Sequence, residues 1–247
     1  MNAKVWLVGA GPGDPELLTL KAVRALREAD MVLIDDLVNP AVLEHCVEAR
    51  VVTVGKRGGC RSTPQDFIHR LMLRYTRQGK CVVRLKGGDP CIFGRGGEEA
   101  MWLRERGVEV ELVNGITAGL AGATSCAVPL TLRGVSRGVT LVTAHTQDDS
   151  SLNWRALAEG GTTLVVYMGV AKLEEIRQQL LDGGMAADMP VAMIENASLP
   201  QQRECRSELA HMHQDAQAFA LKSPAILVIG RVAAPGQLAC LAQAASA

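Results

Sequence analysis

The sequence predicts an α/β protein with two α/β domains whose sheets are mostly parallel. Short apolar runs typical of buried strands alternate with amphipathic segments that repeat with the period of a helix. This alternation indicates parallel strands joined by helices, and it occurs on both sides of a small-residue segment, 114–138. We expect an N-terminal domain over 1–115, a C-terminal domain over 116–232 and a flexible, alanine-rich tail over 233–247.

The expected elements follow one another along the chain. In the first half, apolar runs predict strands at 5–8, 31–34, 51–54, 81–85 and 108–113, with helices over 16–28 and 64–78. Thr63 and Pro64 are expected to be the N-cap and first residue of the second helix. In the second half, strands are expected at 139–143, 162–167, 191–194, 202–208 and 225–229, with helices over 170–182 and 208–220.

Composition limits the classes of partner. The chain has 247 residues, of which 48% are hydrophobic, so it can bury substantial cores. Acidic and basic residues balance at 26 each and aromatics make up 3%, which argues against nucleic-acid binding. No apolar run approaches the roughly 20 residues of a membrane span. The first apolar run is also too short for a secretory signal, so we expect a cytoplasmic protein that binds no membrane.

The seven cysteines lie far apart in the sequence, and none forms a Cys-x-x-Cys pair. This spacing gives no support for a zinc or iron–sulfur site, so no metal is expected. The odd number suits reduced thiols in the cytoplasm. Cys81 falls in a strand-like run and is expected in the core, whereas Cys91 lies in a glycine-rich loop and is expected to be a bystander.

Gly9, Gly11 and Gly13 follow the first predicted strand and resemble part of a dinucleotide-binding loop. Asp14 stands where that loop would have its last glycine. Asp14 and Pro15 instead predict an N-cap and a first-turn proline, and the cap carboxylate would occupy the backbone donors that a pyrophosphate needs. A dinucleotide site and a purely structural tight turn both stay open from these residues alone.

A second glycine-rich stretch, residues 84–99, combines glycines with charged side chains. Glycine is tolerated at this density where the backbone turns tightly or approaches a ligand. Arg95 lies between glycines, so no neighbouring bulk blocks its approach to a ligand, and a guanidinium pairs with carboxylates through two hydrogen bonds. Glu98 lies at an expected helix start, and its carboxylate should stay ionised beside Arg95.

Charged residues follow the ends of three predicted strands. Ligands of open α/β sheets bind beyond the carboxyl ends of the strands, so these groups would converge on one crevice if the strands are parallel. Exposed loop charge is the simpler interpretation for a single residue such as Lys56. The residues concerned are Asp35, Asp36, Lys56, Arg57, Lys86, Asp89 and Arg95.

Short motifs in a fixed order along the chain resemble a known family. They lie at 8–15, 54–57, 87–99, 114–117, 166–169, 195–197 and 223–225, and together they cover about residues 4–231. The stretch Gly-Gly-Asp-Pro followed by Gly-Arg-Gly-Gly-Glu-Glu is the most specific of them. The chain thereby resembles the S-adenosylmethionine-dependent tetrapyrrole methylases, in the branch that methylates uroporphyrinogen III.

The resemblance implies two α/β domains with the active site in the interdomain cleft, and a homodimer. It implies transfer of two methyl groups from S-adenosylmethionine to carbons 2 and 7 of uroporphyrinogen III, through precorrin-1 to precorrin-2. S-adenosylhomocysteine would be the other product. Precorrin-2 would serve sirohaem, cobalamin or haem d1 synthesis, and the sequence does not distinguish these pathways.

The resemblance also implies roles for particular residues. Arg95 and Glu98 are the expected catalytic residues: Arg95 anchors substrate carboxylates, and Glu98 stabilises the cationic pyrrole or accepts its proton. Substrate is expected to contact Lys56, Arg95, Glu98 and Met168. Cofactor is expected to contact Pro12, Gly87, Gly88, Asp89, Thr117, Ala118, Met168, Ala197 and Ala225.

The sequence departs from the family pattern at three positions, and three other functions stay open. Leu132 stands where relatives often carry histidine, Asn114 replaces a frequent proline and Ala144 a frequent glycine. A methylase of the same fold that acts on a later corrinoid would need a substrate loop other than 94–99. A dinucleotide oxidoreductase would bind at 9–13. A non-catalytic module would bind S-adenosylmethionine without turnover.

Overall fold

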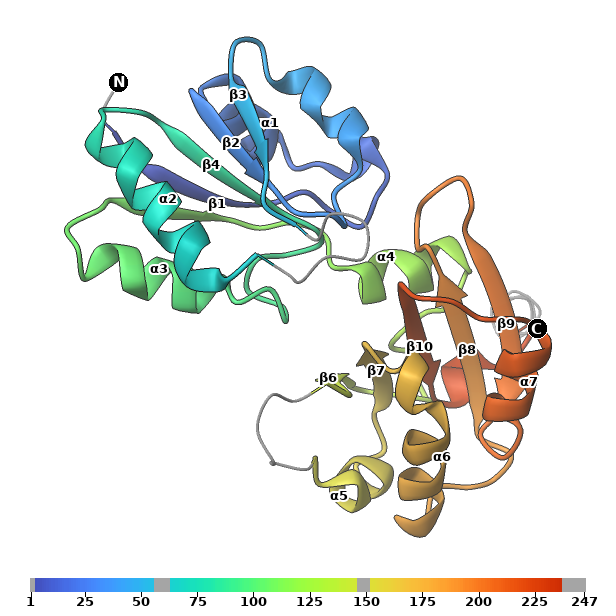
Figure 1. The fold of residues 1–247 in the computed structure, drawn as a ribbon. Coiled ribbons are helices and arrows are strands. Elements are labelled where there is room, and N and C mark those ends of the chain that lie inside the picture. The colour runs from blue at the N-terminus through green and yellow to red at the C-terminus, as the bar shows by residue number, and fades with distance from the viewer. Residues whose placement is uncertain (1–2, 56–62, 146–151, 237–247) are drawn as a thin grey trace. The chain divides into compact units, whose positions relative to one another are not determined.

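The computed structural model describes residues 3–55, 63–145 and 152–236. The chain divides into two compact units, Met1–Thr117 and Ala118–Ala247, and each contains one five-stranded sheet (Figure 1). Helices accompany both sheets, so the predicted class of two α/β domains is confirmed. Most of the predicted tail, residues 237–247, lies outside the described residues.

The sheet of the first unit is entirely parallel. Its strands are β1 (Val5–Gly9), β2 (Met31–Ile34), β3 (Arg50–Thr53), β4 (Val82–Lys86) and β5 (Val110–Val113), in the spatial order β3-β2-β4-β1-β5. All four neighbouring pairs run parallel, as the sequence predicts. Their carboxyl ends therefore lie along one edge, where the loops after β1, β4 and β5 begin.

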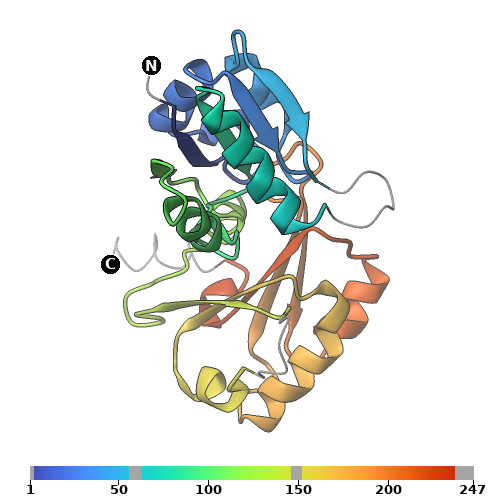
Figure 2. The same cartoon turned by 60° about the vertical axis from the view of Figure 1, so that its left-hand side comes forward.

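Both faces of this sheet are covered, because successive strand residues point to opposite sides. Trp6 and Val8 of β1 belong to the core that includes residues of α1 (Leu20–Arg27). Val5 and Leu7 belong to a second core with α2 (Gln65–Arg77) and α3 (Gly96–Arg104), and Figure 2 shows α2 crossing that face. Nearly continuous apolar strands follow from this two-sided burial.

The helix predicted over 16–28 is divided in two. Asp14 caps a 3₁₀ segment (Pro15–Leu17) by accepting a hydrogen bond from the Glu16 amide at 2.9 Å. Thr19 then caps α1, and its hydroxyl accepts from the Ala22 amide at 3.2 Å. Each polar side chain satisfies backbone donors locally, and the second cap starts a new helix. A second 3₁₀ segment, Pro40–His45, follows β2.

Helix α2 begins one residue later than the sequence predicts. Pro64 lies at the N-cap in an extended conformation, and no side chain caps the helix there. The Thr63 hydroxyl instead donates to the carbonyl of Gly55 at 3.5 Å. Ile68 and Met72 are buried, whereas Phe67 is 54% exposed because it lies off the core-facing stripe.

The sheet of the second unit is mixed. Its strands are β6 (Val139–Thr143), β7 (Thr163–Tyr167), β8 (Pro190–Glu195), β9 (Arg203–Glu208) and β10 (Ala225–Ile229), in the order β6-β7-β10-β8-β9. Only β6 and β7 pair in parallel; the other three pairs are antiparallel. The expected parallel arrangement is therefore corrected for this unit. The 196–202 loop between β8 and β9 is too short for the crossover that parallel neighbours require.

Helices cover this second sheet on both faces. One core contains residues of α6 (Leu173–Asp182) and α7 (Met212–Ala218), with α5 (Trp154–Glu159) packed at its margin. Helix α4 (Ala118–Ser125) lies close to β7, because a Cβ on Gly119 would come within 2.5 Å of the Val165 side chain. Short 3₁₀ segments at Val170–Lys172 and Arg231–Ala233 complete the unit.

Candidate active site

The first part of the candidate site is the carboxyl edge of the parallel sheet at β1 and β4. These neighbouring strands lead into helices on opposite faces, since the loop after β1 continues toward α1 and the loop after β4 toward α3. Ligands of open α/β sheets bind at such a switch point. Gly11 and Gly88 join the two loops here through paired backbone hydrogen bonds of 2.7 and 3.2 Å.

Glycine is required where three loops meet at this edge. A Cβ on Gly9 would lie 2.5 Å from the Gly115 amide nitrogen and 2.6 Å from the Gly88 carbonyl oxygen. A Cβ on Gly115 would overlap the same Gly88 carbonyl. The backbones after β1, β4 and β5 thus touch with no side chain between them. This close approach explains why glycine recurs in the predicted motifs.

The Asp89 carboxylate stabilises this junction through hydrogen bonds. This side chain is buried; Oδ1 accepts from the Cys91 amide at 2.7 Å and Oδ2 from the Gly115 amide at 3.1 Å. The Asn114 amide also donates to Oδ2, at 3.4 Å. Asn114 is one of the departures from the family pattern, and it supplies a donor that proline would lack. The Asp89 carboxylate therefore holds the loops after β4 and β5 together.

Arg95 and Glu98 form a two-pronged ion pair at the start of α3. Arg95 occupies the N-cap with a left-handed φ of 58°. Its Nε donates to Glu98 Oε2 at 3.0 Å and to Oε1 at 3.2 Å, and Nη2 donates to Oε2 at 2.6 Å. These hydrogen bonds lower the pKa of Glu98 and raise the pKa of Arg95. The structure thus brings the two predicted catalytic residues together, with both charged.

The other charges expected at this edge differ in how far they are open to a ligand. Lys86 and Asp35 do converge, with Nζ and Oδ2 3.7 Å apart, but Lys86 is only 6% exposed. Asp36 is exposed, whereas Lys56 and Arg57 lie outside the described residues. Arg95 is the predicted cation whose guanidinium is open, at 43% side-chain exposure. These charged residues therefore differ in burial, and the sequence pattern does not show which of them are buried.

The predicted cofactor residues of the second unit gather at one edge of its sheet. Ala225 at the start of β10 pairs with Glu195 at the end of β8, two residues before Ala197. Met168 follows Tyr167, which pairs with the next residue of β10. Met168 has a left-handed φ of 55° and is 50% exposed, so this edge holds it in an uncommon backbone conformation.

The start of α4 reaches the same edge. The Gly119 amide, next to Ala118, donates to the Tyr167 hydroxyl at 3.0 Å. Thr117 is buried and is the last residue of the first unit, while Pro12 is half-buried in the loop after β1. Leu132 lies in a tight turn in which its backbone exchanges two hydrogen bonds of 2.9 Å with Ser136. The substitution of leucine for histidine there has no explanation in the described contacts.

Glu195 ties two loops of this edge together. Its Oε2 accepts from Arg203 Nη2 at 2.6 Å and from the Lys222 amide at 2.9 Å. The Asn196 amide donates to the Pro224 carbonyl at 3.0 Å, and the Ser223–Pro224 peptide bond is cis. The segments that carry Ala197 and Ala225 are therefore fixed against each other. The hydrogen bond from Arg203 lowers the pKa of Glu195.

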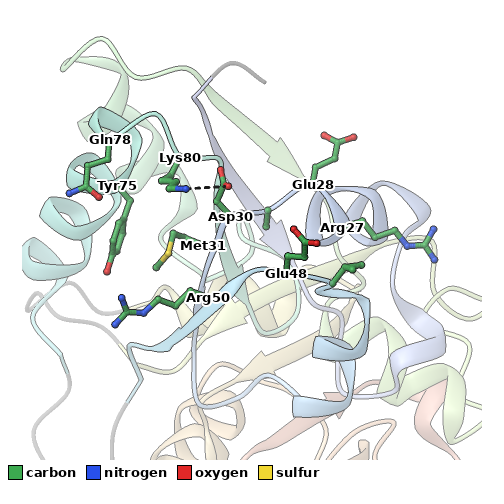
Figure 3. Close-up of a pocket in the computed structure, with 11 residues that line it drawn as sticks. Arg27, Glu28, Asp30, Met31, Glu48, Arg50, Tyr75, Gln78 and Lys80 are labelled. Atoms are coloured by element: carbon green, nitrogen blue, oxygen red, sulfur yellow. Dashed lines mark ion pairs between the residues drawn. The ribbon is translucent and has the colours of Figure 1, made fainter.

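A hollow of about 740 Å³ lies away from all of these residues (Figure 3). It is at the opposite edge of the first sheet, where β2 and β3 begin, and Met31 and Arg50 line it. Lys80 and Asp30 face one another across 3.6 Å in its wall. Side chains of both charges line this hollow. None of the predicted site residues lines it.

Two further features bear on the class of protein. No group of three or more potential metal ligands occurs among residues 3–55, 63–145 and 152–236. Within the same ranges, no helix is both long enough and apolar enough to cross a membrane.

Comparison with known proteins decides the family. Residues 4–213 match the family of Tetrapyrrole (Corrin/Porphyrin) Methylases. The chain belongs to the tetrapyrrole methylases. It is 83% identical to the uroporphyrinogen-III C-methyltransferase of Pseudomonas fluorescens over 247 residues, the full length of both.

Solved structures of tetrapyrrole methylases share the fold. The uroporphyrin-III C-methyltransferase of Thermus thermophilus, solved with S-adenosylhomocysteine, has a TM-score of 0.79 and 42% identity over 93% of this chain and 98% of that one. A cobalt precorrin-4 methyltransferase has a TM-score of 0.85 but 26% identity, over 95% of this chain and 97% of that one. The similar fold therefore accompanies different tetrapyrrole substrates.

The loop at Gly9–Gly13 does not have the features of a dinucleotide-binding site, in agreement with membership of the tetrapyrrole methylases. Asp14 caps the following 3₁₀ segment, as its position predicts, and its carboxylate accepts the Glu16 amide. The backbone donor that a dinucleotide pyrophosphate would need is therefore occupied. Gly9, the first glycine of this spacing, is required by its close approach to Gly88 and Gly115.

Sequence reasoning missed several residues that surround the candidate site. Glu99 was recognised only as part of a charged motif, although it is completely buried. Arg84 lies within a predicted strand and was not singled out. Gln65 and His69 reach the site from α2, which no motif indicates. The one available signal was the charge of Arg84 inside an otherwise apolar predicted strand.

Proposed function

We propose that this chain is a uroporphyrinogen-III C-methyltransferase. It transfers methyl groups from S-adenosylmethionine to carbons 2 and 7 of uroporphyrinogen III and forms precorrin-2 through precorrin-1. The full-length identity of 83% to the Pseudomonas fluorescens enzyme carries this assignment. The product enters sirohaem, cobalamin or haem d1 synthesis, and S-adenosylhomocysteine is released.

The methyl donor is assigned to loops at the edges of the two sheets. In the first unit, the proposed contacts are Pro12, Gly87, Gly88, Asp89 and Thr117. In the second unit, they are Ala118, Met168, Ala197 and Ala225. Because the Asp89 carboxylate already holds three donors, we assign its contact with the donor to the backbone.

The described residues fit a bound molecule of this kind. A Cβ on Gly97 would meet no protein atom within 4 Å, so packing within the chain does not explain why glycine occurs there. In the second unit, the Ala197 and Ala225 side chains add little bulk beside backbone groups. S-adenosylmethionine supplies an electrophilic methyl group on a positively charged sulfur. The chain's own residues align the two reactants and manage the charge.

Arg95 and Glu98 are assigned complementary roles toward the substrate. Uroporphyrinogen carries eight carboxylates, and Arg95 binds one of them through its planar guanidinium. Methylation leaves a positive charge on the pyrrole, which must then lose a proton. The hydrogen bonds from Arg95 lower the pKa of Glu98, so Glu98 stabilises the positive charge more effectively than it would accept a proton. Lys56 and Met168 complete the proposed substrate contacts.

Two finer statements also belong to this proposal. We place the chain in the cytoplasm, and the free state of the five described cysteines is consistent with a reducing compartment. We also propose a homodimer, as the family resemblance implies. Light scattering during size-exclusion chromatography tests the dimer: twice the mass of one chain is expected, and a monomer at micromolar concentration would contradict it.

The choice between uroporphyrinogen III and a later corrinoid is testable directly. Purified protein is incubated without oxygen with S-adenosylmethionine and either substrate, and release of S-adenosylhomocysteine is measured. Release is expected with uroporphyrinogen III and not with a cobalt-precorrin-4-type corrinoid. Release with the corrinoid alone would identify a different methylase, and binding of S-adenosylhomocysteine without turnover on either substrate would indicate a non-catalytic module.

A further inference from the structure

A buried polar network lies behind the Arg95–Glu98 pair. Its members come from α2, β4, α3 and the end of β2. Glu99 is 0% exposed, Arg84 is 2% exposed and Lys86 is 6% exposed, so these charges are removed from water. Two cations and two carboxylates balance within it. The network consists of Asp35, Gln65, His69, Arg84, Lys86 and Glu99.

Glu99 is the centre of this network. Its Oε1 accepts hydrogen bonds from Gln65 Nε2 at 2.6 Å, Lys86 Nζ at 3.2 Å and Arg84 Nε at 3.4 Å. Its Oε2 is buried, with no hydrogen-bond partner among the described residues. One carboxylate on α3 therefore contacts both α2 and β4, the two elements against which the first turn of α3 must be placed.

Arg84 and Lys86 connect Glu99 to the carboxyl edge of the sheet. Arg84 Nη2 donates to Asp35 Oδ1 at 2.6 Å, and Lys86 Nζ lies 3.7 Å from Asp35 Oδ2. Because Asp35 directly follows β2, the network extends from α3 across β4 to the neighbouring strand. On the other side, Gln65 joins Glu99 to His69, with the two Nε2 atoms 3.2 Å apart.

Stability alone does not account for three buried charges at this place, with a fourth, Asp35, partly buried beside them. The cost of removing ions from water offsets most of their attraction, and apolar side chains of similar volume often hold a helix equally well. Apolar contacts, however, allow a helix to rotate or slide, whereas a carboxylate shared by three donors fixes one arrangement. A buried ionic group is therefore expected where the orientation of the helix matters.

Glu99 is placed to fix the orientation of the residue beside it. Successive helical residues point about 100° apart, so a buried Glu99 directs Glu98 away from the core. Glu98 is indeed 58% exposed, and Arg95 pairs with it on that side. We propose that Glu99 is a positioning residue that holds the first turn of α3 so that Arg95 and Glu98 face the substrate. This inference rests on the proposed function.

Replacing Glu99 with glutamine tests the inference. Glu99→Gln keeps the shape of the side chain but removes its charge, leaving Arg84 and Lys86 with Asp35 alone. We expect kcat to fall about 10- to 100-fold, as for a small misplacement of catalytic groups. Affinity for S-adenosylhomocysteine should change less than about threefold. Glu105→Gln, at the exposed end of the same helix, is the matched control and should keep the wild-type kcat.

A second variant separates positioning from stability. Lys86→Met combined with Glu99→Gln restores the charge balance, so we expect thermal stability to return toward that of the wild type while kcat stays low. Recovery of kcat in the double variant would overturn the proposal, because charge balance alone would then suffice. So would a kcat for Glu99→Gln within about twofold of the wild type. If the single variant does not fold, the double variant provides the same test.

A measurement without turnover distinguishes failure of this inference from failure of the proposed function. The Arg95 Nε–H group donates to Glu98, so its NMR signal reports whether the pair is held in place. We expect this signal to move toward that of a free arginine in Glu99→Gln and to be unchanged in Glu105→Gln. An unchanged signal in Glu99→Gln would overturn the positioning role. An inactive wild type with the expected shift would instead contradict the proposed substrate.

Discussion

At the scale of single residues, the Arg95–Glu98 ion pair contributes little to folding stability. Both side chains are exposed, at 43% and 58%, and exposed ion pairs of this kind contribute about 0–1 kcal/mol. The left-handed backbone of Arg95 further opposes folding, since non-glycine residues avoid that region. This fits the proposed role, in which the pair holds two charges ready for a ligand and a substrate carboxylate would compete with Glu98 for the guanidinium.

Substitutions in this pair should change turnover and substrate binding differently. Glu98→Gln is expected to lower kcat about 100-fold, because the negative charge beside the cationic pyrrole is lost. Arg95→Ala is expected to raise KM for uroporphyrinogen about tenfold or more, since a hydrogen bond to a charged group contributes roughly 1.5–3 kcal/mol. Steady-state kinetics without oxygen, with calorimetric binding of S-adenosylhomocysteine, measure both effects.

The second unit offers a matched control for this pair. Arg177 and Glu174 on α6 have the same spacing, and Arg177 Nε donates to Glu174 Oε2 at 2.8 Å. Arg177→Ala and Glu174→Gln should leave kcat and KM unchanged. Near-normal kinetics for both Arg95→Ala and Glu98→Gln, with cofactor binding intact, would refute the assigned roles.

Gly97 and its neighbour Gly96 should respond oppositely to alanine. A Cβ on Gly97 meets open space, so Gly97→Ala is expected to stabilise the helix by about 0.5–1 kcal/mol. It should nevertheless lower kcat/KM, because the methyl group occupies space that we assign to bound molecules. A Cβ on Gly96 would lie 2.5 Å from the Pro90 carbonyl oxygen, so Gly96→Ala is expected to destabilise by about 1–3 kcal/mol.

Chemical denaturation and initial rates distinguish these effects. A Gly97→Ala protein of increased stability and unchanged kcat/KM would show that the space beside Gly97 is not used by substrate or cofactor. A Gly96→Ala protein of unchanged stability would contradict the turn geometry over Pro90.

At the scale of secondary-structure elements, Glu195 holds the ends of β8 and β10. Because Arg203 lies opposite it on β9, the carboxylate joins the β8–β9 hairpin to the segment before β10. The proposed cofactor residues Ala197 and Ala225 lie on either side of this connection. A buried carboxylate that accepts three hydrogen bonds, from Arg203, Lys222 and Asn196, thus fixes a loop that the strands alone would leave free.

Loss of this connection should weaken cofactor binding. Glu195→Gln is expected to raise the Kd for S-adenosylhomocysteine about tenfold, because the charge-assisted hydrogen bond from Arg203 is weakened. Glu208→Gln is the matched control, since Glu208 lies at the other end of the same hairpin, opposite Pro190. Titration calorimetry measures both, and an unchanged Kd for Glu195→Gln would remove this carboxylate from the account of the cofactor site.

The same group should make stability depend on pH. The hydrogen bond from Arg203 lowers the pKa of Glu195 in the folded state below the value of about 4.3 for an unfolded chain. The unfolded state therefore binds the proton more readily, and this stabilisation, complete above that pH, is lost as the pH falls through the folded pKa. Denaturation at a series of acidic pH values should show a shallower decline for Glu195→Gln. Parallel curves for variant and wild type would contradict the assignment.

At the scale of the whole molecule, the sequence predicts the strands well and their pairing less well. Apolar runs predict both α/β units and the positions of nine strands. The 202–208 segment predicts the edge strand β9. The reversed direction of β10 relative to β7 and β8 could not be predicted, because fully buried strands look alike whether parallel or antiparallel. The division of the 16–28 helix depended on the Thr19 cap, which the apolar stripe obscured.

The site was predicted unevenly for a related reason. Glycines that allow close approach, such as Gly88, and the exposed Arg95 belong to contiguous motifs that a sequence displays. Glu99 and Arg84 act through contacts between α2, α3 and β4, and their burial depends on how these elements pack. Glu98 and Glu99 are adjacent glutamates, and the sequence gives no sign of which one is buried. In the structure, Glu98 is exposed and Glu99 is completely buried.

The proposed methyl transfer is tested most directly by locating the methyl groups in the product. The protein is incubated without oxygen with uroporphyrinogen III and S-adenosylmethionine carrying ¹³C in its methyl group, and the product is analysed by ¹³C NMR and mass spectrometry. We predict two labelled methyl groups, on carbons 2 and 7. A label at other positions, or no label despite measurable binding of S-adenosylhomocysteine, would contradict the proposed function.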